Sequence, residues 1–312
     1  MTTFENVELQ RDRFGRPMLM PPSGKGKRIP YRRTTTFVGC LDDQSGLMRW
    51  LENQVAFGMG QRSDLVLAAA ATDPGDKKAL RSIAEAAKEA AAASAAATRG
   101  TALHALTERI DRGQPLGVIP AEFEADIEAY RTATAGIEFI GIETFRVHDE
   151  WTVAGTADRI GMLNGRPVIM DIKTGSIDYP HKMAMQLAMY ARSVSYDIAT
   201  DTRQPDLEPI DLNHGVIIHL PAGEGRCELH EIDIAKGWGA CLIAQQVWSW
   251  RGTKGLTEPL RPRAAPATWE SLARSATDLD RLREIWRRAA ELGEMTNELQ
   301  ALLIARSAEL AA

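Results

Sequence analysis

The sequence has few cysteines and no long apolar run. Its three cysteines, Cys40, Cys227 and Cys241, are too few for a disulfide framework, and none belongs to a Cys-x-x-Cys pair. The alanine-rich tract at 89–97 is interrupted by Ser94, so no segment reaches the roughly 18 apolar residues that a membrane helix needs. The start of the chain is charged and lacks the apolar segment of a secretory signal. These absences predict a soluble protein of the reducing cytoplasm, with no membrane partner.

Basic charge is also scarce overall, but it is unevenly placed. The chain has 37 lysines and arginines against 42 aspartates and glutamates, a formal net charge of -5, which argues against general nucleic-acid binding. Residues 11–33 nevertheless hold eight basic residues and one acid, Asp12, which leaves a net charge of +7 on this segment and -12 on the rest. Such a basic arm favours phosphate binding, because counterion release depends on local contacts. The alternative is a solvated extension rich in Pro and Gly.

Composition and spacing divide the chain into four parts. A mostly irregular basic arm is followed by a globular domain that is helical first and β-rich later. A stretch rich in Pro and Arg is typical of a linker, and the last part shows two amphipathic helices separated by Gly293. The predicted bounds of these parts are 1–35, 36–251, 252–267 and 268–312.

The predicted helices rest on alanine content, helical spacing and end signals. Gly100 is expected to end the first helix and Gly113 to follow the second. Near the end of the chain, Thr277 and Asp280 resemble a capping box, and Thr296 is expected to cap the final helix. The globular domain is predicted to have helices over 79–98, 101–112, 121–135, 181–194 and 235–250, and strands in three runs within 137–175 and over 215–220 and 227–234.

Two aspartates are predicted to face each other across a hairpin. Asn164-Gly165 is a two-residue turn signal between two β-rich runs. A turn there sets Asp158 opposite Asp171, with their Cβ atoms roughly 5 Å apart. Lys173 shares this face because side chains alternate along a strand. The turn therefore predicts a cluster of two carboxylates and one ammonium group.

The neighbours of this pair indicate what it binds. Ile160 and Ile169 lie on the same face, so the two carboxylates are directed toward an apolar interior. Opposed like charges are destabilising there unless one group becomes neutral or a cation lies between them. Oxygen ligands suit a hard divalent ion such as Mg²⁺ or Mn²⁺, and the ammonium of Lys173 could hold a water against it. The alternative is an exposed hairpin whose charges pair with Arg159 or Arg166.

The segment GTADRIGMLNGRPVIMDIKTG, followed by QLAMY, resembles the core of the PD-(D/E)xK nuclease superfamily, in its RecB/Cas4-like exonuclease branch. Four motifs occur in the family's order and span a motif core at 99–195. They are Arg99-Gly100-Thr101-Ala102-Leu103-His104, Gly155-Thr156-Ala157-Asp158, Asp171-Ile172-Lys173-Thr174-Gly175 and Gln186-Leu187-Ala188-Met189-Tyr190. The resemblance implies that 36–251 is a nuclease domain with a restriction-endonuclease-like α/β fold. That fold is a central mixed sheet flanked by helices, here with an N-terminal helical region and a C-terminal helical hairpin.

The resemblance implies a role for each matching residue. The implied catalytic residues are Lys173, Asp158, Asp171, Gln186 and Tyr190. The implied metal ligands are His104, Asp158, Asp171, the backbone carbonyl of Ile172, and Glu143. The implied cofactor is Mg²⁺ or Mn²⁺, which oxygen-rich ligands suit.

Some of these residues also have a purely structural interpretation. His104 could be a packed helical histidine, and Glu143 a surface residue of a strand. Glu108, one turn beyond His104, is either a partner of the metal site or a solvated acid. Gln186 and Tyr190 lie on one helix face, where they either hold DNA or the lysine, or pack the helix against its neighbours.

The cysteines depart from the RecB/Cas4-like pattern. Members of that branch with an iron–sulfur cluster hold it with four cysteines, and this chain has three. We therefore predict no iron–sulfur cluster, and packed thiols at Cys40, Cys227 and Cys241.

The resemblance implies a Mg²⁺-dependent DNA exonuclease of recombination or DNA-end processing, similar to phage-encoded members and thus acting in a host cytoplasm. DNA is the expected partner, held by the basic arm and by Arg251, Lys254, Arg261 and Arg263. The C-terminal helices either cap the core or bind a recombination protein or a second copy of the chain. One alternative is a structure-specific endonuclease for flap or branched DNA. Another is a non-catalytic DNA-binding or assembly protein with a nuclease-like fold.

Overall fold

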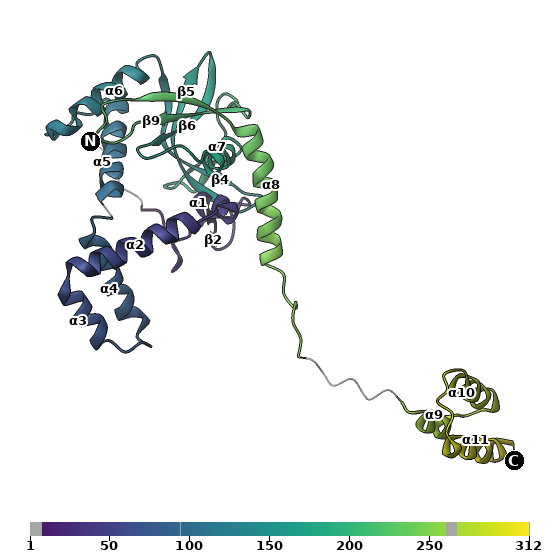
Figure 1. Cartoon of the computed structure of the whole chain (residues 1–312). Helices are drawn as coiled ribbons and strands as arrows, with labels where there is room; N and C mark the ends of the chain where they lie inside the picture. The colour runs from purple at the N-terminus through teal and green to yellow at the C-terminus, as the bar shows by residue number, and fades with distance from the viewer. Residues whose placement is uncertain (1–7, 94, 260–266, 312) are drawn as a thin grey trace. The chain divides into compact units, whose positions relative to one another are not determined.

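The computed structural model describes residues 8–93, 95–259 and 267–311. The chain divides into two compact units, Met1–Gly252 and Thr253–Ala312. The first unit contains a mixed β-sheet with helices on its faces, and the described part of the second contains helices (Figure 1). Among the described residues, no helix is both long and apolar enough to cross a membrane.

The main sheet of the first unit is mixed and has eight strands within the described residues. Seven follow the order β10-β9-β6-β5-β4-β7-β8, and β3 pairs in parallel with β5. The strands are β3 (Arg32–Arg33), β4 (Glu138–His148), β5 (Val153–Leu163), β6 (Arg166–Lys173), β7 (Val194–Asp197), β8 (Thr202–Gln204), β9 (His214–His219) and β10 (Glu228–Asp233). Because β6 and β9 are parallel while β4, β5 and β6 are antiparallel, the predicted mixed sheet is confirmed.

The hairpin between β5 and β6 has the predicted register. Asn164 and Gly165 have φ angles of 51° and 74°, the left-handed values of a two-residue turn. Ile160 stands opposite Ile169, and both are buried. The paired residues end at Arg159 and Met170, one position before the two aspartates. The strands therefore separate where the two carboxylates begin.

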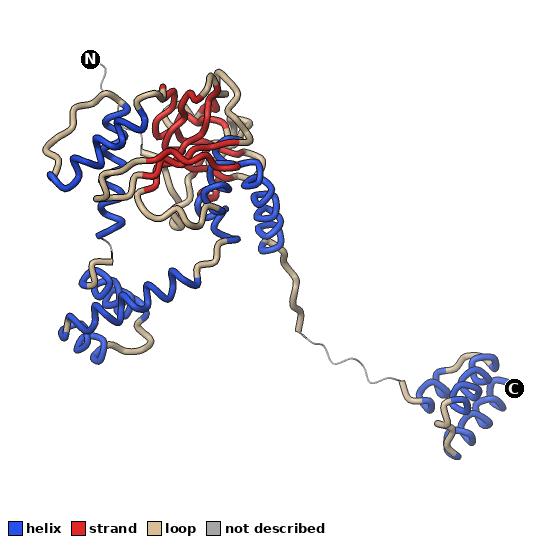
Figure 2. The backbone as a smooth tube through the Cα atoms, turned by 45° about the horizontal axis from the view of Figure 1, so that its top comes forward, coloured by secondary structure: helices blue, strands red, loops and turns tan. Residues whose placement is uncertain are grey.

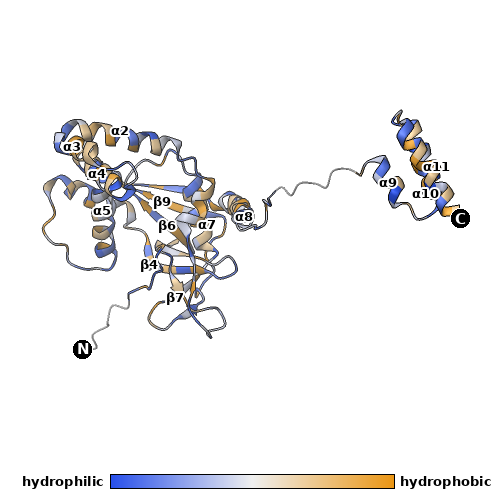
Figure 3. Ribbon diagram, turned by 90° about the horizontal axis from the view of Figure 1, so that it is seen from below, coloured by the Kyte–Doolittle hydropathy of each residue, from blue (hydrophilic) through white to orange (hydrophobic). Residues whose placement is uncertain are grey.

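Helices cover both faces of this sheet (Figure 1). On one face α1, α7 and α8 pack over a core that includes Ile160, Ile169 and Ile217, and Figure 3 shows hydrophobic residues along β9 and α8. On the other face Ile110 and Tyr130 pack against strand residues. The elements on these faces are α1 (Thr34–Val38), the short 3₁₀ helix η1 (Gly39–Leu41), α5 (Ala95–Asp111), η2 (Ala121–Phe123), α6 (Glu124–Thr134), α7 (His181–Ala191) and α8 (Ile234–Arg251).

Three more helices of the first unit pack on one another. They are α2 (Ser45–Gln61), α3 (Ser63–Ala71) and α4 (Lys77–Ala90), and Figure 2 shows them as a group of helices beside the strands. Gly58 of α2 lies so close to α4 that an added Cβ would be 1.8 Å from the carbonyl oxygen of Ala87. This close approach explains a glycine within α2.

The predicted helix over 79–98 is wrong at its end. It stops at Ala90, and α5 begins at Ala95 and runs through Gly100. An added Cβ at Gly100 would be 2.6 Å from Thr174 Oγ1. Gly100 therefore allows α5 to approach the chain just after β6, and does not end a helix. Gly113 has a φ of 64° directly after α5, as a terminating glycine requires.

The basic arm is anchored to the first unit. Two short strands, β1 (Met18–Leu19) and β2 (Ile29–Pro30), pair with each other, and β3 then joins the main sheet beside β5. Leu19 and Tyr31 are fully buried in a small core with residues of β4 and β7. Hydrophobic anchors within the arm thus bring its basic residues beside the start of β5, which charge alone could not predict. Its first residues, 1–7, lie outside the described part of the chain.

The second unit adds one helix ahead of the predicted hairpin. Its helices are α9 (Trp269–Ser275), α10 (Leu279–Glu291) and α11 (Asn297–Ala311), and Leu282, Ile285 and Leu299 are buried among them. Thr296 caps α11 as predicted, since its hydroxyl accepts a hydrogen bond from the Leu299 backbone amide at 3.1 Å. The predicted capping box at Thr277 is wrong. The Asp278 carboxylate caps α10 through the Arg281 amide at 2.8 Å. Residues 260–266 of the predicted linker lie outside the described residues.

The contact between α7 and α8 depends on Gly237. A Cβ added there would be 2.3 Å from the carbonyl oxygen of Ala184, whereas Gly239 has no atom within 4 Å of such a Cβ. We expect Gly237→Ala to lower the free energy of unfolding by about 1–3 kcal/mol through overpacking. Gly239→Ala should raise it by roughly 0.5–1 kcal/mol, because alanine is the better helix former. Urea unfolding of both variants measures this, and equal effects would contradict the close packing of the two helices.

Candidate active site

Asp158 of β5 and Asp171 of β6 lie where their strands separate. The Asp158 carboxylate takes the place of a strand carbonyl, since its Oδ2 accepts a hydrogen bond from the Ile172 backbone amide at 2.9 Å. Asp171 is only 2% exposed, and the Asp158 side chain is 16% exposed. The local backbone therefore holds the two carboxylates next to each other, where they have little access to water.

Two side chains surround Asp171. The Lys173 ammonium forms an ion pair with Asp171 Oδ2, and the Gln186 amide of α7 donates to Oδ1 at 3.2 Å. The ion pair lacks hydrogen-bond geometry, and no other donor among the described residues reaches Oδ2. A buried carboxylate oxygen without a hydrogen bond is costly. It is also an oxygen that can bind a metal ion.

The charges of the two aspartates oppose each other. Burial raises the pKa of Asp171, the negative charge of Asp158 raises it further, and Lys173 lowers it in part. Burial likewise raises the pKa of Asp158, against the hydrogen bond from Ile172 and the charges of Lys173 and Arg159. These two cations thus do not fully compensate the two buried carboxylates, and a divalent cation would.

His104 and Glu143 complete the group of charged residues. His104 Nδ1 is 3.5 Å from Asp158 Oδ2, and burial lowers the pKa of its imidazole, which favours the neutral form that binds metals. Glu143 faces Asp158 between two paired positions of β4 and β5, with a φ of 51°. Burial and then the charge of Asp158 raise the pKa of Glu143 to about 7. The structure thus brings both residues to Asp158.

Tyr190 lies behind Gln186 on α7. Its side chain is 3% exposed, and its hydroxyl interacts with Gln186 and with Thr34 of α1. An added Cβ at Gly155 would be 2.7 Å from Thr34 Oγ1 and 2.9 Å from the Tyr190 hydroxyl. Gly155 therefore leaves room for Tyr190, and Tyr190 supports the glutamine that holds Asp171.

The comparisons with known proteins agree with this geometry. A family model described as the PD-(D/E)XK nuclease superfamily matches residues 59–302, more than half of the chain. The chain belongs to the PD-(D/E)XK nuclease superfamily. A search of curated proteins found no match. Membership in the superfamily, together with the central mixed sheet flanked by helices, identifies a restriction-endonuclease-like fold and implies a nuclease, a hydrolase of a class that uses divalent metals.

The superfamily motif is buried here, which contradicts the alternative of an exposed hairpin. Arg159 does not pair with the two aspartate side chains. Its fully buried guanidinium is directed to Asp111 at 2.5 Å and to Glu143 at 3.1 Å. The Tyr130 hydroxyl donates to the same Asp111 oxygen at 2.7 Å. This cluster holds Glu143 against β5. Sequence reasoning missed Asp111, although it follows His104 at helical spacing on α5.

Glu108, the three cysteines and the Ile172 carbonyl are the other residues that the sequence singled out. Glu108 pairs with Arg112 at 2.9 Å and is partly exposed, while its negative charge also raises the pKa of Glu143, so it lies near the site without contacting the two aspartates. Cys40 and Cys241 pack in the core under α7 and α8, while Cys227 packs in the core of the opposite face. The Ile172 carbonyl belongs to β6 between the two charged side chains, Asp171 and Lys173.

Proposed function

We propose that the protein is a Mg²⁺-dependent DNA exonuclease of the RecB/Cas4-like type, acting in recombination or DNA-end processing, as phage-encoded members do. One observation carries the catalytic part of this proposal. Two buried carboxylates, Asp158 and Asp171, face each other, and one Asp171 oxygen has no hydrogen bond and contacts only the ammonium of Lys173 among the described residues. Carboxylates that serve only stability usually lie on the surface, where water hydrates them and each has its own basic partner.

The chemistry of the donor set fits a hard divalent ion. Asp158, Asp171 and the Ile172 carbonyl supply oxygen ligands, and His104 and Glu143 lie close enough to Asp158 to contribute. Oxygen-rich sites of this kind suit Mg²⁺ or Mn²⁺. When bound, such an ion polarises a phosphate oxygen and lowers the pKa of a coordinated water.

Lys173 is suited to hold the attacking water. Its side chain is 28% exposed, so the ammonium lies between the buried Asp171 and solvent. From this place it donates hydrogen bonds to a water that approaches the scissile phosphate, and stabilises negative charge as it develops. Gln186 and Tyr190 keep Asp171 in position for this contact.

The basic arm approaches this site along β5. Arg11 and Arg33 line a cavity of about 160 Å³ whose other walls include Thr35, Thr156 and Tyr190. Arg251 and Lys182 line another hollow that also includes Arg33. Arginine, lysine and threonine side chains at these positions are suited to contact the DNA backbone, and backbone contacts read no base sequence. Sequence-independent contact favours end resection over site-specific cleavage. Arg261 and Arg263 lie outside the described residues.

The experiment is digestion of end-labelled linear DNA and covalently closed circular DNA with Mg²⁺. We expect loss of the linear DNA, no nicking of circles, and no cleavage in EDTA. Nicking of circles, or cuts at flaps and branches alone, would instead indicate the structure-specific endonuclease. DNA binding without cleavage of any substrate in Mg²⁺ or Mn²⁺ would contradict both enzyme proposals and favour a non-catalytic DNA-binding protein.

A further inference from the structure

Three metal-ligating side chains meet at the outer edge of the main sheet, on β9 and β10. His219, Glu228 and His230 each place one ligand atom within 4.8 Å of those of the other two. The strand register produces this cluster, because His219 stands opposite Glu228 and His230 is two residues further along β10. All three side chains therefore lie on one face of the sheet.

The atoms of the cluster have the separations of metal ligands, and they have lone pairs available to bind a metal. His230 Nε2 is 3.3 Å from Glu228 Oε2. It is buried and has no hydrogen bond with any described residue. His219 Nε2 lies 3.1 Å from the Gly175 carbonyl oxygen. A hydrogen bond from Nε2 to that oxygen leaves the lone pair on Nδ1, and it orients the ring as the outer hydrogen bonds of metal-bound histidines do.

We propose that His219, Glu228 and His230 form a binding site for Zn²⁺ or a similar divalent transition metal. Two imidazoles and one carboxylate suit zinc, and imidazole is a poor ligand for Mg²⁺. Zinc bonds of about 2.0–2.1 Å place tetrahedral ligand atoms roughly 3.3 Å apart, the distance already present between His230 and Glu228. The fourth position is open to water, because Glu228 and His230 are partly exposed.

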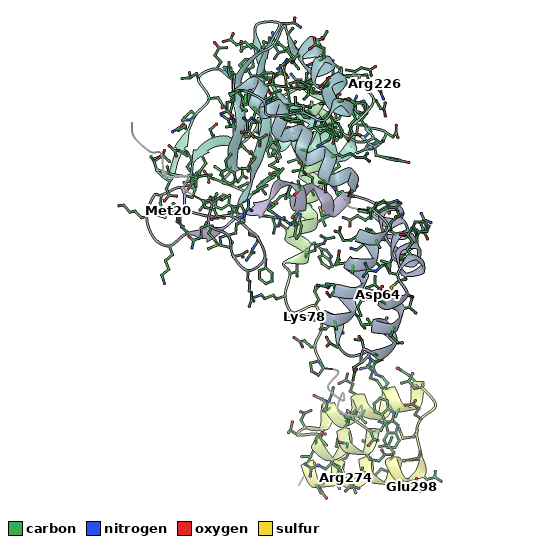
Figure 4. All side chains as sticks on the ribbon, turned by 90° about the vertical axis from the view of Figure 1, so that its left-hand side faces the viewer. Met20, Asp64, Lys78, Arg226, Arg274 and Glu298 are labelled. Carbon is green, nitrogen blue, oxygen red and sulfur yellow. The ribbon has the colours of Figure 1, made fainter. Side chains whose placement is uncertain are left out.

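The neighbouring residues do not replace the metal. Arg226 is 3.5 Å from Glu228 Oε2, but its closer partner is Glu224 at 2.8 Å. Arg226 lies at the periphery of the first unit, where its side chain can turn to solvent (Figure 4). Cys227 packs in the core of the opposite face of the sheet, so its thiol is not part of this cluster. A bound cation would thus displace only a weak ion pair.

This metal would act on the strand that carries the catalytic lysine. His219 pairs with Lys173 in the parallel β6–β9 ladder, and the Gly175 carbonyl that contacts His219 belongs to the segment just after Lys173. A ligand sphere at His219 would fix this segment against β9 and β10. The site is thus structural, and it differs from the oxygen-rich pair in its ligands and in its metal.

The test is titration of Zn²⁺ into metal-free protein, in excess Mg²⁺ to occupy the carboxylate pair. We expect one equivalent of Zn²⁺ to bind to the wild type and to Asp171→Asn, and to raise the Tm of both. Affinity should fall by about tenfold or more in His230→Ala and in Glu228→Gln, because losing even a residue that only supports a metal ligand costs about 10–100-fold. Glu228→Gln keeps the shape of a half-exposed side chain, so it is expected to fold.

His214→Ala is the matched control. This histidine stands at the other end of β9, is half-exposed and lies 3.6 Å from Asp211, so its loss should leave Zn²⁺ binding unchanged. Absence of Zn²⁺ binding to the wild type, or equal binding by the wild type and His230→Ala, would overturn the proposal. Loss of binding in Asp171→Asn would also overturn it, because the ion would then belong to the carboxylate pair.

Discussion

Lys173→Ala is expected to lower the rate of Mg²⁺-dependent DNA cleavage by about 10²–10⁴-fold, the usual size of a lost proton-transferring or charge-stabilising side chain. Among the described residues, Lys173 is the cation in contact with Asp171. Its ammonium group is partly exposed, so it can reach both a water molecule and a phosphate. Single-turnover cleavage of end-labelled linear DNA measures the rate. DNA binding should change little, because in our proposal the basic arm supplies most of the phosphate contacts.

Lys236→Ala is the control for this prediction. Its side chain is 87% exposed and pairs with Asp233 at the start of α8, so the variant loses the same charge away from Asp158 and Asp171. We expect wild-type cleavage from it. A Lys173→Ala variant that is folded and cleaves within threefold of wild type would show that Lys173 has no catalytic role.

Asp171→Asn is expected to have two opposite effects. Cleavage should fall by about 10³-fold or more, because a metal ligand and its charge are lost. The metal-free protein should become more stable by about 1–2 kcal/mol at neutral pH, because the fold disfavours the charged form of Asp171 and the partly exposed Lys173 can turn to solvent once unpaired. Cleavage assays and urea unfolding with EDTA measure the two effects. Stability that falls together with activity would show that Asp171 serves mainly to hold the fold.

The pH dependence of the free energy of unfolding tests the stabilising effect of Asp171→Asn. The pKa of Asp171 is raised in the fold, so the protonated form is favoured there. Its unfavourable contribution is absent at acidic pH, below the unfolded pKa. It appears as pH rises toward the folded pKa, and is complete above it. The stability advantage of Asp171→Asn should therefore grow with pH, and Mg²⁺ should reduce it by stabilising the wild type alone. Asp178→Asn, on the exposed loop before α7, should show neither effect.

The hairpin site could be predicted from the sequence because its geometry is local. A two-residue turn fixes which residues face each other, so Asn164-Gly165 determined the β5–β6 register and the side of the sheet on which Asp158 and Asp171 lie. Gln186 needed the family resemblance, since only the packing of α7 on the sheet brings it to Asp171.

Other features depend on contacts between distant segments, and the sequence could not predict them. Gly100 resembles a helix terminator by composition, but the approach of α5 to Thr174 is what requires it. The buried Arg159–Asp111 pair joins β5 to α5 across 48 residues. The arm was recognised by its charge, yet Leu19 and Tyr31 give it its place in the fold. In each case the reason for the residue lies in a partner far along the chain.

The most direct test of the proposed catalytic site is a crystal structure with Mn²⁺, read by its anomalous signal. We expect a peak bounded by the Asp158 and Asp171 carboxylates and the Ile172 carbonyl, with Lys173 turned toward the solvent side. The peak should be absent from Asp171→Asn crystals soaked in the same way. Full Mn²⁺-dependent cleavage by the same preparation, with no ion between the two carboxylates, would contradict the account.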